Sequence, residues 1–450
     1  MQWLSNHYLI LLLLVGYTAI LARHAVAGNR RTKSMADYYV GGRSMGGIAL
    51  GISYFATYSS TNSFIGISGQ TYSYGLPWLL FVPTITVFCV IAWRWVAPRL
   101  REVTASLGSV TIPDFIGFRF HSDAARFAAG LIVVFASVLY MTAVFKGVGT
   151  LLELFLEIPY SWAIFLVLII VMLYTAIGGF ISVVKTDVIQ GVIMMVAAIL
   201  LFVGIVRASG GLGSFATVRD LPGGSALFSW DAAMPFPVLM GLIIAGTFKL
   251  VVEPRQLSRF YALKSPAEAQ RGMWVATLAF LCVYSLLLPI GMYAHHIFPT
   301  GVTDTDQIIP QILSGGLVFH PALSAFLVLA MIAAAMSSLD SVLLVLASTC
   351  ERDIVGVWRR TESEAATIKE TRFYVALFAI VTALVALNPP GSIVTLTAFS
   401  GSLYAACFFP AIILGLYWNK GNGAAVLAAF AMGIGTLTLW RYVPGVSGVH

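Results

Sequence analysis

Apolar stretches long enough to cross a lipid bilayer follow one another along almost the whole chain, and they limit its possible folds more than any other feature. A helix needs about 20 mainly apolar residues to span the hydrocarbon core. Inside that core every backbone N–H and C=O must be paired within the protein, which α-helices achieve. About twelve stretches meet the length requirement, near residues 8–25, 45–74, 76–98, 128–152, 160–177, 181–206, 236–262, 269–297, 318–350, 370–388, 391–417 and 423–442.

The composition excludes a soluble domain. Of the residues, 59% are hydrophobic and only 10% are charged, and the mean hydropathy is +0.90. Such values are typical of polytopic membrane proteins. We therefore predict an all-α multi-pass protein of the cell membrane, with the lipid bilayer as its surroundings.

The net charge of +7 does not require a nucleic-acid partner, because the basic residues gather in alternate loops. Loops rich in Lys and Arg stay on the cytoplasmic side. By our assignment these loops hold Arg23, Arg30, Arg31, Lys33, Arg43, Arg94, Arg99, Arg101, Arg119, Arg126, Lys185, Arg255, Arg259, Lys264, Arg271, Arg352, Arg359, Arg360, Lys369, Arg372 and Lys420. The opposite loops hold Glu153, Glu157, Asp220, Asp231, Asp304 and Asp306. One orientation satisfies all of them, with the N-terminus outside and no nucleic acid bound.

The first apolar stretch has neither a positive n-region nor a clear small-residue cleavage site. It therefore predicts a retained outside-in helix rather than a removed signal peptide. The cysteines stand singly in apolar segments and lack the spacing of a disulfide framework or a metal site. No set of nucleophile and base stands out either, so we do not expect an enzyme.

Two of the stretches are interrupted by polar residues and glycines. The first contains "FATYSSTNSFIGISGQ" (55–70) and the second "GLIIAGTFKLVVEPRQLSRF" (241–260). An odd number of expected spans separates the start of one from the start of the other, so the second would enter the membrane in the opposite direction. Broken helices at matching positions of two inverted repeats indicate a transporter with its site near the bilayer midplane. Two unrelated kinked helices remain the alternative.

Four motifs carry a resemblance to a known family. They are a segment beginning "YYVGGRSMGG" (38–76), "YTAIGGFISVVKTDVIQG" (174–191), "SRFYALKS" (258–265) and "AAAMSSLDSVLLVLASTCERDI" (333–354). In this order and separation they resemble the first core helix, the fourth-to-fifth helix junction, the end of the sixth and the eighth core helix of the sodium/solute symporter family.

The resemblance implies a LeuT-like core of 5+5 inverted repeats, with one extra N-terminal helix and at least one C-terminal helix. We accordingly expect three parts. Residues 1–37 form the N-terminal outside-in helix and a basic cytoplasmic loop, 38–420 the ten-helix transporter core and 421–450 a C-terminal helix. The resemblance also implies that uptake of a small-molecule solute is coupled to a sodium ion.

Four small residues share one face of the expected helix at 318–350. Ala334, Ser337, Ser338 and Ser341 fall at i, i+3, i+4 and i+7. Hydroxyls and free carbonyls suit sodium, a hard cation that prefers oxygen, without burying a full charge. The alternative is that Ser337 and Ser338 bond back to their own helix, as serines in membrane helices often do.

The resemblance implies the partners of this face. The family's sodium site corresponds to the carbonyls of Ala56, Ser59 and Ala334 with the hydroxyls of Ser337 and Ser338. In some relatives a second cation site lies at the positions of Asp187, Ser337, Asp340 and Ser341. Carboxylates at membrane depth are costly and usually functional. Here Asp340 replaces a hydroxyl, so it could strengthen a cation site, carry a proton or pair with a basic residue. Asp187 could instead lie at the inner helix end beside Lys185.

The remaining polar residues of the interrupted stretches are candidate solute or gate contacts, namely Ser60, Asn62, Ser63 and Gln70. Lys249 is a further candidate, because a buried ammonium needs an anion, which a solute carboxylate or Glu253 at i+4 could supply. Lys146 is a weaker second candidate, since it could extend outward toward Glu153.

We therefore expect a sodium-coupled secondary symporter that imports a small organic anion, similar to a monocarboxylate, by alternating access. Family members often carry Asp or Asn at the position of Tyr58, which weakens a transfer of proline or sugar specificity. The alternatives are a sodium/neutral solute symporter of the proline, sugar or pantothenate type, the membrane sensor domain of a histidine kinase, and a channel or lipid-scrambling protein with the same fold.

Overall fold

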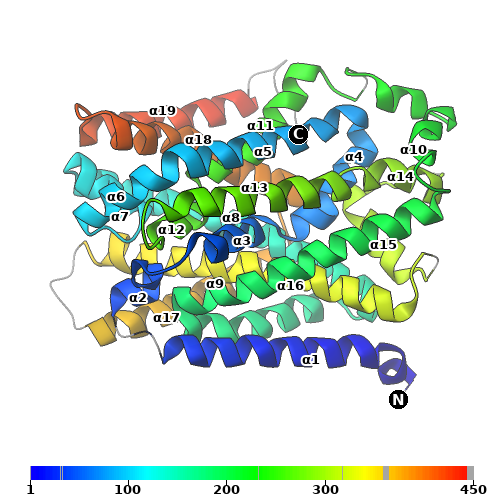
Figure 1. Cartoon of the computed structure of the whole chain (residues 1–450), viewed down its shortest axis with the longest axis horizontal. Coiled ribbons are helices and arrows are strands. Elements are labelled where there is room, and N and C mark those ends of the chain that lie inside the picture. Colours follow the sequence, from blue (N-terminus) through cyan, green and yellow to red (C-terminus); the bar gives the residue numbers. More distant parts are fainter. Residues whose placement is uncertain are drawn as a thin grey trace.

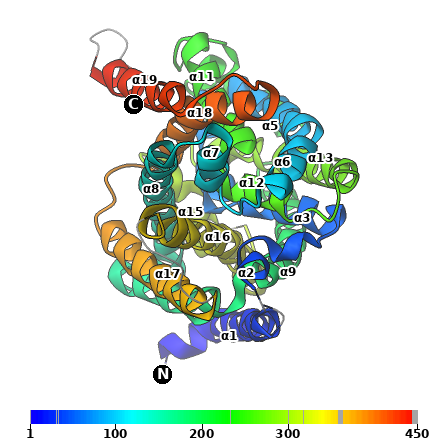
Figure 2. The same cartoon turned by 90° about the vertical axis from the view of Figure 1, so that its left-hand side faces the viewer.

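The chain forms a bundle of helices, shown from two directions in Figures 1 and 2. The computed structural model describes residues 2–30, 32, 34–231, 233–299, 301–316, 318–357 and 364–442. Within these ranges the elements are α1 (Gln2–Asn29), α2 (Met35–Val40), η1 (Gly41–Arg43), α3 (Gly47–Tyr58), η2 (Asn62–Ile67), α4 (Ser68–Tyr74), η3 (Leu76–Leu80), α5 (Phe81–Ile91), η4 (Ala92–Val96), α6 (Ala97–Leu107), α7 (Ile112–Phe120), α8 (Asp123–Leu156), α9 (Tyr160–Ala208), α10 (Ser214–Thr217), η5 (Val218–Asp220), η6 (Gly224–Phe228), α11 (Phe236–Val252), α12 (Pro254–Tyr261), α13 (Glu268–Leu287), α14 (Ile290–Ile297), η7 (Thr305–Gln307), α15 (Ile308–Ser314), α16 (Pro321–Thr349), η8 (Cys350–Val355), α17 (Glu364–Ala386), α18 (Ile393–Tyr417) and α19 (Gly423–Tyr442).

The described part of the chain contains eight helices long and apolar enough to cross a membrane. They cover His7–Asn29, Leu76–Leu107, Asp123–Leu156, Tyr174–Ala208, Phe236–Tyr261, Glu268–Ile297, Pro321–Val355 and Ile393–Tyr417. Two shorter apolar helices are Tyr160–Met172 and Gly423–Leu439. The expected spans near 45–74 and 370–388 are helical as well. The prediction of an all-α polytopic membrane protein is confirmed.

The first interrupted stretch is a broken helix. Helix α3 ends at Tyr58, and Ser59 has an extended backbone (φ −74°, ψ 112°). The chain then resumes in the π-helix η2 and continues into α4. Serine and threonine side chains compete for backbone hydrogen bonds and so favour a break, and π-helical turns are frequent at functional sites.

The second interrupted stretch breaks at one residue. Glu253 is extended (φ −72°, ψ 126°) between α11 and α12. The cause is Pro254, which disfavours helical backbone at the preceding residue and lacks the N–H that would continue the ladder. Its place at the start of α12 costs little, because the first helical N–H has no partner in any case.

The two spans expected at 160–177 and 181–206 are joined without a loop. Both lie in α9, which bends at Gly179, where φ is 62° and ψ is −178°. Only glycine adopts this backbone region readily. A Cβ at this position would also lie 2.9 Å from Cδ2 of Tyr38. Glycine therefore permits both the bend and the close packing of α2 beside it.

Helix α16 lies inside the bundle and packs against α9, α8 and α3, and nearly all of its side chains are buried. Figure 2 shows α1 at one edge of the bundle and α19 at the opposite edge. Helix α1 packs on α9 and α16, in agreement with one extra helix before the core. The largely buried α16 can therefore present polar groups to its neighbours away from lipid.

The structure corrects one part of the loop assignment. Arg255 and Arg259 are only 2% and 1% exposed and belong to α12 inside the bundle, not to a cytoplasmic loop. Both lie within the expected span at 236–262, and the apolar residues of α11 dominate the mean hydropathy of that span.

Four further basic residues of the predicted loops lie outside the described residues, namely Arg31, Lys33, Arg359 and Arg360. The same holds for the last part of the predicted C-terminal segment, 443–450. The division into 1–37, 38–420 and 421–450 stays a prediction.

Candidate functional site

The two helix breaks lie side by side. The Tyr54 hydroxyl donates to the carbonyl of Leu250 at 2.6 Å, and the Tyr58 hydroxyl donates to the carbonyl of Gly246 at 2.7 Å. From α12, the guanidinium of Arg255 donates to the carbonyl of Thr57 at 2.7 Å. These bonds hold the end of α3 against both halves of the second broken helix.

Buried polar atoms without a hydrogen-bond partner among the described residues gather at these breaks. They are Ser59 Oγ, Thr61 Oγ1, Asn62 Oδ1, Glu253 Oε2 and Arg255 Nη2. Buried polar groups in proteins are nearly always paired, so an unpaired group needs an explanation. The two opposed breaks therefore carry polar atoms that are free to bind another group.

The residues predicted for the sodium site come together where α16 meets the end of α3. The Ser338 hydroxyl donates to the carbonyl of Thr57 at 3.0 Å, and Thr57 lies between Ala56 and Ser59 in the chain. Ala334 lies one turn before Ser338, and all of these residues are fully buried. Carbonyl and hydroxyl oxygens at a helix break suit sodium chemically.

Ser337 has a different partner from its neighbour. Its hydroxyl donates to Oδ1 of Asp187 at 2.5 Å, across to α9. Ser337 and Ser338 thus both bond to other helices, not back to their own. The structure places Ser337 with Asp187, a residue of the predicted second cation site.

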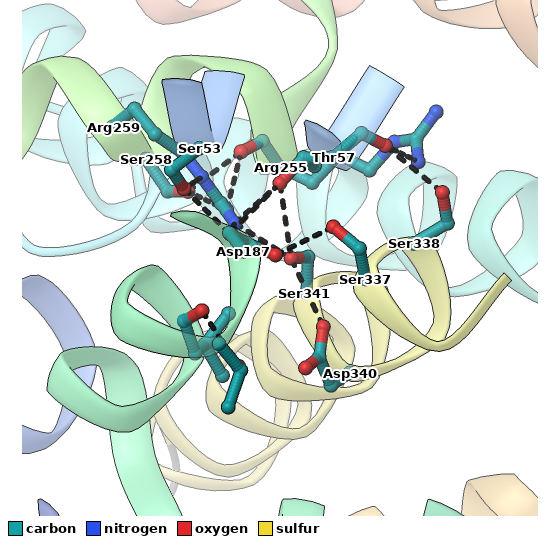
Figure 3. Close-up of polar contacts among 12 residues, drawn as sticks. Ser53, Thr57, Asp187, Arg255, Ser258, Arg259, Ser337, Ser338, Asp340 and Ser341 are labelled. Carbon is teal, nitrogen blue, oxygen red and sulfur yellow. Dashed lines mark hydrogen bonds and ion pairs between the residues drawn. The ribbon is translucent and has the colours of Figure 1, made fainter. Parts of the chain in front are cut away.

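The second predicted site is a network that we name the carboxylate cluster (Figure 3). It consists of Ser53, Thr57, Asp187, Arg259, Ser337, Asp340 and Ser341. Asp187 is fully buried, so it does not lie at an exposed helix end. Ser53 donates to Oδ2 of Asp187 at 2.5 Å, and Ser341 donates to Oδ1 of Asp340 at 3.3 Å.

Arg259 is one of three members of the carboxylate cluster that sequence reasoning missed, together with Ser53 and Thr57. Its Nη2 lies 2.8 Å from Oδ2 of Asp187 and donates to the hydroxyls of Thr57 at 2.5 Å and Ser341 at 2.6 Å. Its place within the expected span at 236–262, in the motif "SRFYALKS", was the available signal. Only the packing of α12 against α3, α9 and α16 reveals its partners.

A small cavity at the breaks contains two of the predicted solute contacts. We name it the helix-break cavity, and its polar and aromatic lining is Tyr58, Asn62, Trp78, Phe81, Lys249 and Thr397. Its volume of about 20 Å³ has room for roughly one water molecule. A solute can therefore enter only if the lining side chains or the surrounding helices move apart, as alternating access requires.

Lys249 lines this cavity and forms no salt bridge with an acidic side chain of the described residues. Its Nζ lies 5.0 Å from the ring centroid of Tyr58 and 5.6 Å from that of Tyr140. Glu253 pairs instead with Arg255 at 2.6 Å. Lys249 therefore forms no salt bridge with Glu253, and the rings of Tyr58 and Tyr140 lie at cation–π distance from its ammonium.

The remaining predicted solute residues lie around the break or away from it. Ser63 exchanges a hydrogen bond with the hydroxyl of Tyr284 at 2.6 Å, and Ser60 accepts one from the backbone of Asn62 at 3.2 Å. Gln70 reaches Thr305 at 3.5 Å. The structure does not bring Gln70 to the lining of the helix-break cavity.

Lys146 also lies away from the helix-break cavity. Its Nζ lies 3.6 Å from the carboxylate of Asp306 and donates to the carbonyl of Gly391 at 3.3 Å. It therefore joins α8 to η7 and to the start of α18 rather than extending toward Glu153. Asp306 could not be foreseen as its partner, because the two lie far apart in the sequence.

A membrane bundle with two broken helices that meet around buried, unpaired polar groups is the architecture of a secondary transporter. The chain belongs to the sodium:solute symporter family, which matches residues 38–433. It is accordingly a sodium-coupled symporter of a small solute and not an enzyme.

Two curated relatives are similar over almost their full lengths. The chain is 30% identical over 443 residues to the sodium/pantothenate symporter of Haemophilus influenzae, covering 96% of this chain and 90% of that one. It is 30% identical over 442 residues to the osmoregulated proline transporter OpuE of Bacillus subtilis, covering 96% and 87%.

A solved structure of a sodium-coupled sialic acid symporter in a substrate-bound outward-open state has the same fold. The TM-score is 0.83 at 21% identity, with 96% of this chain and 92% of that chain covered. The expected LeuT-like core is thereby confirmed.

Proposed function

We propose that this protein imports a small organic acid of the pantothenate type together with sodium, and that the acid binds in the helix-break cavity. The observation that carries the proposal is Lys249, which lines this cavity and whose ammonium forms no salt bridge in the part of the chain that the structure describes. A solute carboxylate would supply the missing charge, and buried charges require such pairing.

The lining of the cavity distinguishes between the solutes of the relatives. It contains one basic side chain and no acidic one among the described residues. A solute with a carboxylate and no ammonium, such as pantothenate, therefore matches its charge better than a zwitterion. Hydroxyl and amide groups of such a solute would form hydrogen bonds with Asn62 and Thr397. Its apolar part would pack against Trp78 and Phe81. A simple monocarboxylate lacks groups for these contacts, so we replace that expectation.

Proline is the second candidate, favoured by the aromatic side chains around the cavity. Tyr58, Trp78 and Phe81 line it, and aromatic faces attract an ammonium group by about 0.5–2 kcal/mol. Proline would place its carboxylate on Lys249 and its ring nitrogen over one of these faces. The presence of OpuE among the relatives supports testing it beside pantothenate.

The test is uptake into proteoliposomes under an inward sodium gradient. We expect accumulation of labelled pantothenate, no accumulation when potassium replaces sodium, and little uptake of panthenol, the neutral alcohol analogue. Equal uptake of pantothenate and panthenol would reject the role of the carboxylate. Sodium-driven uptake of proline alone would transfer the assignment to the second candidate. Sodium flux without any solute accumulation would favour a channel or a sensor.

The predicted orientation, with the N-terminus outside, is part of the proposal. Figure 1 shows α2, α6 and α7 at one end of the bundle. Two basic side chains bind loop carbonyls there. Arg43 donates to the carbonyl of Ser109 at 2.7 Å, and Arg101 donates to the carbonyl of Leu263 at 2.5 Å. The positive-inside rule assigns this end to the cytoplasm. Labelling of an N-terminal epitope on intact cells would support this orientation, and labelling only after permeabilisation would reject it.

A further inference from the structure

A pocket lies between η4, the start of α6 and the start of α13, away from the transport site. We name it the Arg94 pocket. Its lining includes Trp93, Arg94, Pro98, Ala267, Gln270 and Met273, and its volume is about 320 Å³. Binding sites for small ligands start at about 300 Å³. The Arg94 pocket shares no residue with the lining of the helix-break cavity, so solute binding there does not explain it.

The Arg94 pocket carries a positive charge that no carboxylate balances. Among the described residues, Arg94 is the one charged side chain of the lining, and it is exposed. It forms no ion pair or hydrogen bond with another residue that the structure describes. The two acidic residues nearest to the lining in the sequence already have partners, since Glu268 pairs with Arg271 at 3.0 Å and Glu102 with Arg99 at 3.6 Å.

Exposed aromatic residues put the Arg94 pocket at the level where the bilayer meets water. Trp95 and Trp274 are the chain neighbours of Arg94 and Met273, and they are 53% and 58% exposed. The hydroxyl of Tyr417, a third exposed aromatic residue, donates to the carbonyl of Trp95 at 2.7 Å. Tryptophan and tyrosine concentrate at membrane–water interfaces. Figure 2 shows α13 at the right-hand edge of the bundle, so its outer side meets lipid.

We propose that the Arg94 pocket binds the headgroup of an anionic phospholipid from the leaflet at this end of the bundle. The guanidinium of Arg94 donates paired hydrogen bonds to the phosphate, a geometry that suits arginine. The amide of Gln270 binds the polar part of the headgroup, and the acyl chains lie over Met273 and Trp274. A zwitterionic headgroup fits less well, because its ammonium finds no unpaired carboxylate. Basic pockets between membrane helices bind anionic headgroups for the same reason.

A lipid in the Arg94 pocket is connected to both broken helices through Trp93. The ring of Trp93 lies 5.3 Å from that of Tyr54 on α3 and 4.9 Å from that of Phe260 on α12, centroid to centroid. Helix α13 packs against α3 and against η4. A bound headgroup therefore holds η4 and α13 together beside the ends of the two broken helices that meet there.

Native mass spectrometry of the purified full chain tests the proposal by titration with phosphatidylglycerol and with phosphatidylcholine. We expect phosphatidylglycerol to bind about fivefold more tightly, a ratio set by one basic side chain at the membrane surface. Arg94→Gln should abolish this preference and Arg94→Lys should keep most of it. Arg99→Gln is the matched control, because it removes a charge from α6 outside the pocket lining and should leave the preference unchanged. Ala267→Trp fills the pocket without changing its charge and should weaken phosphatidylglycerol binding.

Each other outcome overturns the proposal. An unchanged preference in Arg94→Gln would reject the role of Arg94, and an equal loss in Arg99→Gln would assign the preference to the general surface charge. Full phosphatidylglycerol binding by Ala267→Trp would place the lipid elsewhere. Displacement of the lipid by inorganic phosphate or glycerol 3-phosphate would make the ligand a soluble phosphate. The titration contains neither sodium nor solute, so its failure and that of the proposed function are distinguishable.

Discussion

Arg259 on α12 and Asp187 on α9 form an ion pair at 2.8 Å in which both side chains are at most 1% exposed. The pair ties the second broken helix to the long helix that bends at Gly179. Because α3 and α16 also contribute hydroxyls to the same guanidinium, four elements meet at one charge. A conformational change that separates α12 from α9 must break this ion pair. A change that keeps the pair must move the two helices together.

Removing one partner of this pair should destabilise the protein strongly. We expect Arg259→Met to lower the free energy of unfolding by about 3–5 kcal/mol, because it leaves Asp187 buried and unpaired. The double variant with Asp187→Asn should recover part of that loss, as a double-mutant cycle would show. Thermal unfolding in detergent measures both. Arg271→Met is the control, because the Arg271 side chain of its ion pair with Glu268 is 70% exposed. This substitution should lower the free energy of unfolding by less than about 1 kcal/mol.

The Ser338 hydroxyl should contribute to sodium affinity. In Ser338→Ala we expect the sodium concentration for half-maximal uptake to rise about tenfold, which corresponds to the loss of about 1.4 kcal/mol. Solute affinity should fall with it through coupling. Ser337→Ala should raise the sodium requirement as well, because it removes a hydroxyl oxygen of the predicted sodium site. Sodium titration of uptake is the measurement, with Ser348→Ala as the unaffected control. Normal sodium dependence in both variants would contradict the site.

Lys249 should discriminate charged from neutral solutes. Lys249→Met should weaken pantothenate binding by roughly 10–100-fold, because hydrogen bonds to charged groups contribute about 1.5–3 kcal/mol. Inhibition by panthenol should hardly change, since panthenol has no carboxylate that could pair with the lysine ammonium. Lys146→Met is the comparison, because its ammonium contacts Asp306 and not the cavity. Competition binding on purified protein reports the ratio of the two affinities. A parallel loss for both compounds would indicate a general packing defect.

Gly179 should not tolerate a side chain. Gly179→Ala forces a non-glycine residue to φ 62° and ψ −178° and should cost about 1–3 kcal/mol in backbone strain. The new Cβ would also press on the ring of Tyr38 at 2.9 Å. We expect a lower melting temperature and lower yield. Gly241→Ala, in α11 with no atom within 4 Å of the added Cβ, should be neutral or slightly stabilising. Equal melting temperatures for the two variants would disprove the steric argument.

The amino-acid sequence determined the helices, the two breaks and the small-residue face of α16. Hydropathy over about 20 residues specifies a spanning helix whatever its neighbours are. Local chemistry specifies a break, because Pro254 and the Ser59–Thr61 hydroxyls act on the backbone next to them. The face containing Ala334 and Ser338 follows from helical periodicity alone. These features depend only on residues close together in the chain.

Only the tertiary structure decided which polar groups meet. Arg259 looked like a loop residue because its charge was counted with the basic loops, and the sequence does not reveal that α12 buries it inside the bundle. Adjacent Ser337 and Ser338 bond to α9 and α3 respectively, a choice set by a rotation of about 100° between neighbouring side chains on a helix. Lys146 pairs with Asp306 across a long separation in sequence. A buried charge takes whichever partner the packing of distant helices brings within hydrogen-bond distance, and no local pattern encodes that distance.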